Sequence, residues 1–200
     1  MSARPARPLG VLLAPGAGAD RDAPTLVAID EVATAAGLTV VRMDFPYRKA
    51  GRKAPDRPPV LLAAVREEAA QLAPRVSALV LGGRSMGGRM CSMAVAEDLP
   101  AAGLVLISYP LHPPGRPDRK RTEHFPGLNV PCLFVSGTRD AFGTPDELEA
   151  AGRAIPGPVT YRWIDGKDHA LRGADRAVAD LVLEWLGELK PARNSIRAHP

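Results

Sequence analysis

The sequence has 200 residues, enough for one domain with a hydrophobic core and too few for two such domains. Hydrophobic residues make up 46% of it and charged residues 24%, a balance typical of globular proteins. The formal net charge is +4, but the Arg and Lys residues gather at the chain ends and in Pro-rich segments, without a nucleic-acid-binding motif. We therefore expect no nucleic-acid partner. A basic nucleic-acid binder, the alternative, would need a strongly salt-dependent affinity.

No apolar run approaches the roughly 20 residues that a membrane-spanning helix needs. The segment 1–8 is interrupted by prolines and leads directly into an apolar run, which argues against a cleaved signal peptide. Cys91 and Cys132 lie in apolar stretches without the spacing of a zinc or redox pair, so we expect buried free thiols. These features predict a cytoplasmic protein without membrane association and without a metal.

Short apolar runs alternate with amphipathic patterns from one end of the chain to the other. The runs predicted to be strands are residues 9–14, 39–43, 78–81, 104–107, 132–135 and 160–164. Most are unbroken, as in parallel strands that helices cover on both faces. The last run mixes polar and aromatic residues and is predicted to be an edge strand.

Apolar residues at helical spacing lie between these runs. Their stripes are Leu26, Ile29, Ala33 and Ala36; Leu61, Val65, Ala69 and Leu72; Met86, Met90 and Met93; and Val178, Leu181, Val182, Trp185 and Leu189. The Met stripe is predicted to be core rather than a ligand surface. A further helix is predicted to start at Thr144-Pro145, with Thr144 as its cap and Glu147 bonding back. This alternation predicts an α/β fold, a mostly parallel sheet of about six strands with helices on both faces.

We expect a single domain over residues 9–190, a flexible N-terminus over 1–8 and a loose polar tail over 191–200. Two long loops rich in Pro and Arg interrupt the domain, at residues 46–59 and 109–129. Both follow the carboxyl ends of predicted strands, where ligands bind in open α/β sheets. Loops of this length in a compact domain are usually functional or mobile.

The segment Gly83-Arg84-Ser85-Met86-Gly87 stands between a predicted strand and a predicted helix. The pattern G-x-S-x-G in this context is typical of a nucleophile elbow, in which a sharp turn exposes the serine and the glycines let strand and helix pass closely. The segment alone also fits a Gly-rich turn with an N-capping serine, or a phosphate cradle at the start of the helix.

A serine hydroxyl needs a base to take its proton. Among the histidines, His169 follows the last predicted strand and precedes the last helix, where a fold of this kind presents its base. The carboxylate that orients the base should follow a strand between Ser and His in the chain. Asp140, after the run 132–135, fits this role. Asp146 is the competitor, although its place in a first helical turn favours a role in the helix dipole.

Ester cleavage also requires backbone N–H groups that stabilise the negatively charged oxygen of the intermediate. One donor is predicted at Met86, the residue after the nucleophile. The other is predicted at Ala17 or Gly18, in the small-residue segment that follows the first strand. That segment alone also fits a flexible Gly-rich turn.

These segments together resemble those of an α/β-hydrolase of the dienelactone-hydrolase-like group, in particular its small branch related to the Tex30 and KANSL3 proteins. The resemblance covers about residues 8–190 and rests on residues 14–18, 42–47, 82–89, 108–111, 137–140 and 168–169. It implies a triad of Ser85, Asp140 and His169 that works through an acyl-enzyme, with no cofactor.

Two departures limit what the resemblance implies. Dienelactone hydrolases use a cysteine nucleophile, whereas this chain has Ser85, so their substrate is not carried over. The chain also begins near the family's third strand and has no inserted cap domain. We therefore expect a shallow site covered only by the two Pro-rich loops.

The expected substrate is a small acyl ester or thioester. Candidate residues for binding it are Arg84, Tyr109, His112 and Arg116. Arg89 and Arg119 lie near the same segments, and these arginines would favour an anionic substrate. The main alternative is a non-catalytic interaction domain that keeps the hydrolase fold, although competent residues at all three triad positions favour an enzyme. The oligomeric state is left open.

Overall fold

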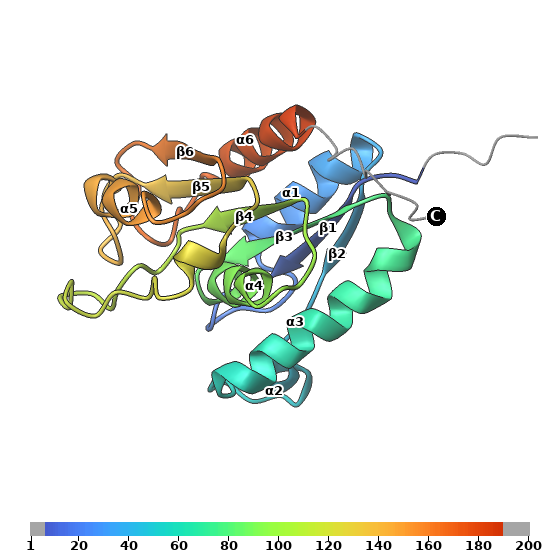
Figure 1. The fold of residues 1–200 in the computed structure, drawn as a ribbon, viewed down its shortest axis with the longest axis horizontal. Helices are drawn as coiled ribbons and strands as arrows, with labels where there is room; N and C mark the ends of the chain where they lie inside the picture. The colour runs from blue at the N-terminus through green and yellow to red at the C-terminus, as the bar shows by residue number, and fades with distance from the viewer. Residues whose placement is uncertain (1–6, 190–200) are drawn as a thin grey trace, which may run out of the picture.

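The computed structural model describes residues 7–189, in which parallel strands form one sheet in the order β2-β1-β3-β4-β5-β6. The strands are β1 (Gly10–Ala14), β2 (Thr39–Arg42), β3 (Leu79–Arg84), β4 (Gly103–Ile107), β5 (Cys132–Gly137) and β6 (Val159–Ile164). All neighbouring strands run parallel, and helices connect them (Figure 1). The predicted α/β class, the six strands and their parallel pairing are confirmed.

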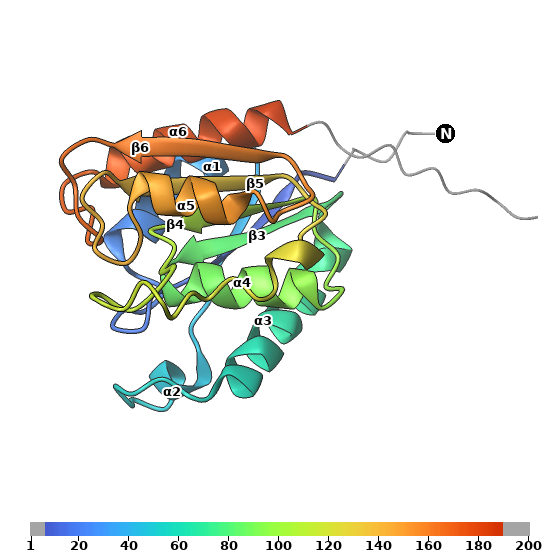
Figure 2. The same ribbon diagram turned by 60° about the vertical axis from the view of Figure 1, so that its left-hand side comes forward.

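The helices lie in a layer on each side of the sheet (Figure 2). They are α1 (Pro24–Ala35), α2 (Pro46–Lys49), α3 (Pro58–Leu72), α4 (Met86–Ala96), α5 (Pro145–Gly152) and α6 (Asp175–Glu188), with the 3-10 turns η1 (Ala73–Arg75) and η2 (Phe125–Gly127). One face packs against α1 and α6, and the other against α3, α4 and α5. Within residues 7–189, no helix has the length and apolar character that crossing a membrane requires.

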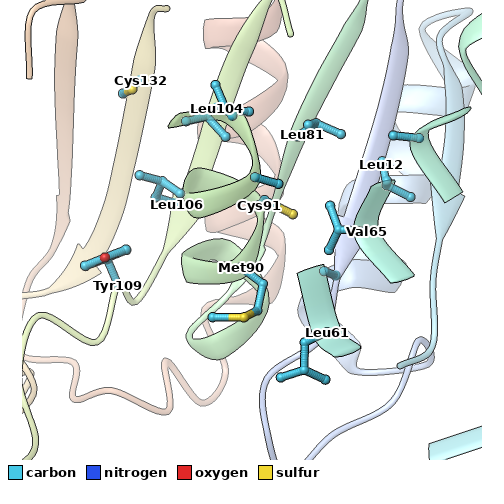
Figure 3. Packing of buried hydrophobic residues seen from close by; sticks show 14 of the residues in the cluster. Leu12, Leu61, Val65, Leu81, Met90, Cys91, Leu104, Leu106, Tyr109 and Cys132 are labelled. Atoms are coloured by element: carbon cyan, nitrogen blue, oxygen red, sulfur yellow. The ribbon is translucent and has the colours of Figure 1, made fainter. Parts of the chain in front are cut away.

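An apolar cluster fills the space between each helix layer and the sheet. Leu12 faces α3 and α4, where Leu61 and Met90 also point into the cluster (Figure 3). Its neighbours Val11 and Leu13 belong to the cluster under α1 and α6. Successive residues of β1 are therefore buried on opposite faces, which explains why the strand sequence is continuously apolar.

The cysteines and the methionine stripe are part of this core. Cys91 and Cys132 are buried free thiols, as predicted. Met90 is buried, and Met86 and Met93 pack against the same cluster while partly exposed. The stripe therefore contributes to the core, as the sequence indicates.

β3 is longer than the predicted strand 78–81 because it continues to Arg84. Gly82 and Gly83 pair with β1 on one side and β4 on the other. Glycine has a low strand propensity, which concealed this extension in the sequence. The last strand, β6, pairs only with β5, and all of its residues are partly exposed, so the predicted edge position is confirmed.

Prolines mark the starts of several helices. They lie in the first turns of α1, α2, α3 and α5, where the fixed φ of proline suits the helix and its missing N–H costs nothing. The predicted cap of α5 is present. Thr144 Oγ1 accepts a hydrogen bond from Glu147 N at 3.4 Å, and Glu147 Oε2 accepts one from Thr144 N at 2.9 Å.

The two Pro-rich segments differ from each other. Residues 46–59 are not a continuous loop, because α2 starts at Pro46 and α3 at Pro58. Residues 109–129 include η2 near their end, and the first part of the segment extends beyond the body of the molecule (Figure 1). Of the predicted flexible ends, residues 1–6 and the tail 191–200 lie outside the described residues. Pro8 is held in place, since its carbonyl accepts a hydrogen bond from Ser77 N at 2.8 Å.

Candidate active site

A sharp turn at Ser85 joins the end of β3 to the start of α4. Ser85 has φ 51° and ψ −116°, a backbone conformation that side chains other than glycine rarely adopt. Gly83 and Gly87 allow this turn to pack against β1, because a Cβ at either position would collide with the carbonyl oxygen of Ala14. The strained turn raises Ser85 from the sheet edge, which is the geometry expected of a nucleophile elbow.

Ser85 is the first member of a continuous chain of hydrogen bonds. His169 Nε2 lies 2.9 Å from Ser85 Oγ, and His169 Nδ1 lies 2.8 Å from Asp140 Oδ2 and 3.0 Å from Oδ1. A neutral imidazole with its proton on Nδ1 satisfies both contacts, since Nδ1–H donates to the carboxylate and Nε2 accepts from the hydroxyl. This arrangement can take the serine proton and stabilise the imidazolium that results.

Asp140 is buried at the carboxyl end of β5, with 1% of its surface exposed. Its Oδ1 also accepts a hydrogen bond from Phe142 N at 2.8 Å, so the carboxylate has two donors. The competitor Asp146 lies exposed in the first turn of α5, as its sequence position suggests. The structure thus brings Asp140, and not Asp146, to His169.

The loop after β5 and the loop that carries His169 are joined directly. Arg139 N donates to the carbonyl oxygen of Lys167 at 2.9 Å. Gly166 N donates to Thr138 Oγ1 at 2.8 Å. These bonds hold the loops of Asp140 and His169 next to each other, although 29 residues separate the two side chains in the sequence.

Two further residues support His169, and one of them is not foreseen from the sequence. The ring of Phe142 stacks on the imidazole with ring centroids 4.0 Å apart and 30° between the planes. Arg84 Nη2 donates to the carbonyl oxygen of His169 at 2.8 Å. Arg84 was expected to bind substrate, but its guanidinium holds the histidine loop instead. Burial lowers the pKa of Arg84, and the negative charges of Asp175, Asp140 and Asp168 partly oppose that shift.

The predicted donors for a negatively charged oxygen are the backbone N–H groups of Met86 and of Ala17 or Gly18. Within residues 7–189, the backbone N–H groups of Met86, Ala17 and Gly18 have no hydrogen-bond partner. The segment after β1 lies next to the nucleophile, since a Cβ at Gly16 would be 3.7 Å from Ser85 Cβ. Tyr47 donates from its hydroxyl to the carbonyl oxygen of Ala17 at 2.8 Å. That bond fixes the planar peptide unit to which the Gly18 N–H also belongs.

A family model described as an alpha/beta hydrolase domain matches residues 8–184 of the chain. The chain belongs to this α/β-hydrolase family. Among residues 7–189 of this α/β-hydrolase, no separate domain is inserted between the strands. Nor does that part of the chain contain a group of three or more His, Cys, Asp or Glu side chains arranged to hold a metal ion.

Solved structures share the fold of this α/β-hydrolase. A Xanthomonas campestris protein of the α/β-hydrolase superfamily is 23% identical, with a TM-score of 0.69 over 92% of this chain and 100% of that chain. Est1E from Butyrivibrio proteoclasticus is 16% identical, with a TM-score of 0.74 over 92% and 88%. Dienelactone hydrolase from Anabaena variabilis is 20% identical, with a TM-score of 0.73 over 94% and 88%. At these identities the likeness shows the fold alone, and the narrower relation to the Tex30 and KANSL3 proteins stays a prediction.

Within residues 7–189, the remaining substrate-binding candidates of this α/β-hydrolase form no hydrogen bond with Ser85 or His169. Tyr109 is in the core, where it contacts Phe125 and Phe134. His112 is buried, and its ring nitrogens contact the carbonyl oxygen of Pro113 at 2.8 Å and Glu147 Oε2 at 3.4 Å. Arg116 is exposed on the extended loop and pairs with Asp118 at 3.8 Å. Tyr109 and His112 therefore stabilise the segment 109–129 rather than line an open site.

A second Ser–His contact lies on α4, between Ser92 Oγ and His124 Nε2 at 2.8 Å. Ser92 is fully buried, and its hydroxyl donates to the carbonyl oxygen of Arg89 at 2.9 Å. His124 Nε2 must then carry the proton and donate to Ser92 Oγ. Burial, followed by the positive charge of Arg89, lowers the pKa of His124 to about 4. This pair lacks an orienting carboxylate and is suited to holding the loop against α4, not to nucleophilic attack.

Two apolar cavities of about 550 and 480 Å³ lie away from the Ser85 site, at the amino end of β3. Both are lined by Ser77, Ala78 and Ala102. None of Ser85, Asp140 and His169 lines either cavity. Ligands of open α/β sheets bind at the carboxyl ends of the strands, so the chemistry points to the Ser85 site and not to these two cavities.

Proposed function

We propose that this α/β-hydrolase is a serine esterase or thioesterase that cleaves a small acyl ester through an acyl-enzyme on Ser85. The observation that carries the proposal is the hydrogen-bond chain from Ser85 Oγ through His169 to Asp140, with the serine on a strained turn. The backbone N–H groups of Met86, Ala17 and Gly18, which form no hydrogen bond within residues 7–189, support the proposal as donors to the oxyanion. Est1E, a protein of similar fold, has been solved with ferulic acid bound.

The proposed reaction has two halves. Ser85 Oγ attacks the carbonyl carbon while His169 Nε2 takes the hydroxyl proton, and the N–H groups of Met86 and of Ala17 or Gly18 stabilise the oxyanion. Collapse of the intermediate breaks the bond to the leaving alcohol or thiol, which receives that proton from His169. Water then attacks the acyl-enzyme with His169 again as base, and the carboxylic acid leaves as Ser85 recovers its proton.

Asp140 and the surrounding residues would act by holding His169. The carboxylate favours the tautomer with its proton on Nδ1 and stabilises the imidazolium. Phe142 and Arg84 restrict the position of the imidazole and its backbone. No metal or organic cofactor takes part in these steps. A cytoplasmic location remains a prediction from cysteine usage.

The proposal can be tested by hydrolysis of p-nitrophenyl acetate and butyrate together with labelling by a fluorophosphonate probe. We expect the wild-type protein to hydrolyse both esters and mass spectrometry to place the label on Ser85. The Ser85→Ala and His169→Ala variants should lose about 10³-fold or more of kcat/KM, because nucleophile and base act as one unit.

Ser92→Ala is a matched control, since Ser92 also contacts a histidine but is buried. This variant should keep the label on Ser85 and most of the activity. A folded wild-type protein that neither reacts with the probe nor cleaves the esters would contradict the proposal. It would favour the interaction-domain alternative, for which partners would be sought by pull-down.

A further inference from the structure

Arg89 lies on the side of α4 that faces the segment 109–129. It follows Ser85 by one helical turn, and its backbone N donates to the carbonyl oxygen of Ser85 at 3.1 Å. Ser85 immediately precedes α4, so Arg89 lies about 6 Å further along the helix axis. Three residues further on, Ser92 contacts His124 of the segment 109–129. Arg89 therefore stands between the nucleophile and the point where this segment meets α4.

Arg121 approaches the same region from the segment 109–129. Its backbone N donates to the carbonyl oxygen of Leu111 at 2.8 Å, and its carbonyl accepts from the Tyr109 hydroxyl at 2.6 Å. Within the part of the chain that the structure describes, the guanidinium has one hydrogen bond, from Nη1 to the carbonyl oxygen of Pro110 at 3.4 Å. The backbone of Arg121 is thus fixed while most of its side-chain donors are unused.

Arg89 and Arg121 border the same contact between α4 and the segment 109–129, where Ser92 meets His124 and the Tyr109 hydroxyl donates to the Arg121 carbonyl. Burial lowers the pKa of Arg121, and the positive charge of Arg89 lowers it further. Arg89 Nε is buried without a hydrogen-bond partner. Within residues 7–189 neither guanidinium forms an ion pair, and Glu123 on the same segment is exposed and forms none with them. Two neighbouring cations with unused donors are unfavourable together unless an anion lies between them.

We propose that Arg89 and Arg121 form a subsite for a carboxylate group on the ester that Ser85 attacks. This inference rests on the proposed esterase function and adds a substrate class to it. Guanidinium groups bind carboxylates through paired, charge-assisted hydrogen bonds. A distance of about one helical turn from Ser85 suits a carboxylate a few carbon atoms from the scissile carbonyl, as in the half-ester of a short dicarboxylic acid.

Of the arginines that the sequence singles out for an anionic substrate, the subsite includes Arg89 but not Arg84, Arg116 or Arg119. Arg84 is occupied by the carbonyl oxygen of His169. Arg116 is exposed and pairs with Asp118. Arg119 is also exposed on the extended loop. We therefore assign selection of an anionic substrate to Arg121, at the base of the loop, and to Arg89 on α4, and not to the arginines at the loop tip.

The test compares mono-p-nitrophenyl glutarate with its neutral methyl ester, which have the same acyl chain. We expect the wild-type protein to prefer the anionic ester. In Arg89→Met and in Arg121→Met, the ratio of kcat/KM between the anionic and the neutral ester should fall about 10- to 100-fold. In the double variant, the ratio should fall by a smaller factor than the product of the two single-variant factors, because both groups bind one carboxylate.

Arg75→Met is the control, since Arg75 is exposed in η1 before β3 and should leave the ratio unchanged. The subsite would be overturned if both esters are hydrolysed but the Arg89 and Arg121 variants leave the anionic-to-neutral ratio of kcat/KM unchanged. A change of this ratio in Arg116→Met instead would also overturn it. Either result would leave the esterase function intact. Absence of any hydrolysis would contradict the esterase function itself. In that case the subsite can still be tested by measuring glutarate binding with calorimetry. The subsite predicts that Arg89→Met binds glutarate at least about 10-fold more weakly than the wild type. Equal binding by the two proteins would overturn the subsite.

Discussion

Arg84 is a partly buried cation that contacts the backbone of His169. Its guanidinium donates to the carbonyl oxygen of His169, and its Nε is buried without a partner. Burying a charged group is unfavourable unless its contacts compensate. Its contact with the loop that carries His169, the proposed base, explains why a charged group is retained here, so we propose Arg84 as a positioning residue.

Replacing Arg84 with methionine, which keeps much of the side-chain volume, should lower kcat on a neutral ester by about 10- to 100-fold with little change in KM, because a small displacement of the base is costly. Arg84→Lys should recover part of the loss, since an ammonium can donate to the same carbonyl. Steady-state kinetics and thermal unfolding of both variants provide the measurement. A methionine variant with full kcat and an unchanged midpoint would contradict this role.

Single residues were predictable where chain order and strand context define them. Ser85, Asp140 and His169 each follow a strand, and the sequence order Ser, Asp, His left few candidates. Phe142 and Arg84 were not predictable in the same way. Their roles depend on the folded loop after β5, which brings Phe142 onto the imidazole, and on the distance from β3 to the histidine loop. Neither relation has a local sequence pattern.

At the scale of elements, the close contact between α4 and β1 depends on glycine. Gly87 lies in the first turn of α4 against the carbonyl oxygen of Ala14, and Gly83 meets the same oxygen from β3. The spacing of these glycines around Ser85 was visible in the sequence. The partner strand was not, because β1 is about 70 residues away and pairs with β3 only in the folded sheet.

We expect Gly87→Ala to lower the free energy of unfolding by about 1–3 kcal/mol, because the new methyl group has no room against β1. Gly187→Ala is the matched control, since Gly187 lies in α6 with no atom within 4 Å of an added Cβ. This change should raise the free energy of unfolding by roughly 0.5–1 kcal/mol through helix propensity. Urea titrations followed by circular dichroism compare the two. A shift of both variants in the same direction would be inconsistent with this packing.

The boundaries of elements were less predictable than their existence. The prolines of residues 46–59 indicated a loop, but Pro46 and Pro58 begin helices. Proline is compatible both with a loop and with a first helical turn, and only the packing of the following residues distinguishes the two. The apolar stripe from Leu61 to Leu72 marked the body of α3 and not its start.

For the molecule as a whole, His124 makes stability depend on pH. Its pKa is lowered to about 4 in the folded protein by burial and by Arg89, whereas an unfolded histidine titrates near 6.5. Between these values the unfolded chain binds a proton that the folded protein does not. The free energy of unfolding should therefore fall as the pH drops from about 6.5 to 4, by at most about 3 kcal/mol.

His124→Gln removes this titration and keeps a donor for Ser92 Oγ. We expect the variant to lose less stability than the wild type between pH 6.5 and 4, so that the difference between them shifts in favour of the variant as the pH falls. Urea titrations at several pH values measure the difference. Parallel curves for the two proteins over this range would show that His124 does not contribute.

The fold as a whole was predictable because the sequence patterns of strands and helices repeat along the chain. Unbroken apolar runs and helical stripes alternate along the chain, and parallel sheets with right-handed connections accommodate that alternation. The strand order was not contained in any one run, since β1 lies between β2 and β3 although β2 follows it directly in sequence.

From β3 onward the strands join the sheet in the order in which they occur along the chain, ending with β6 at the edge. During synthesis on the ribosome, the serine turn and the strands beside it can therefore assemble before the histidine loop has emerged. A nascent or truncated chain that lacks this last part contains Ser85 without the proposed base, His169. Under the proposed function, esterase activity is therefore expected only after the loop that carries His169 has joined the sheet.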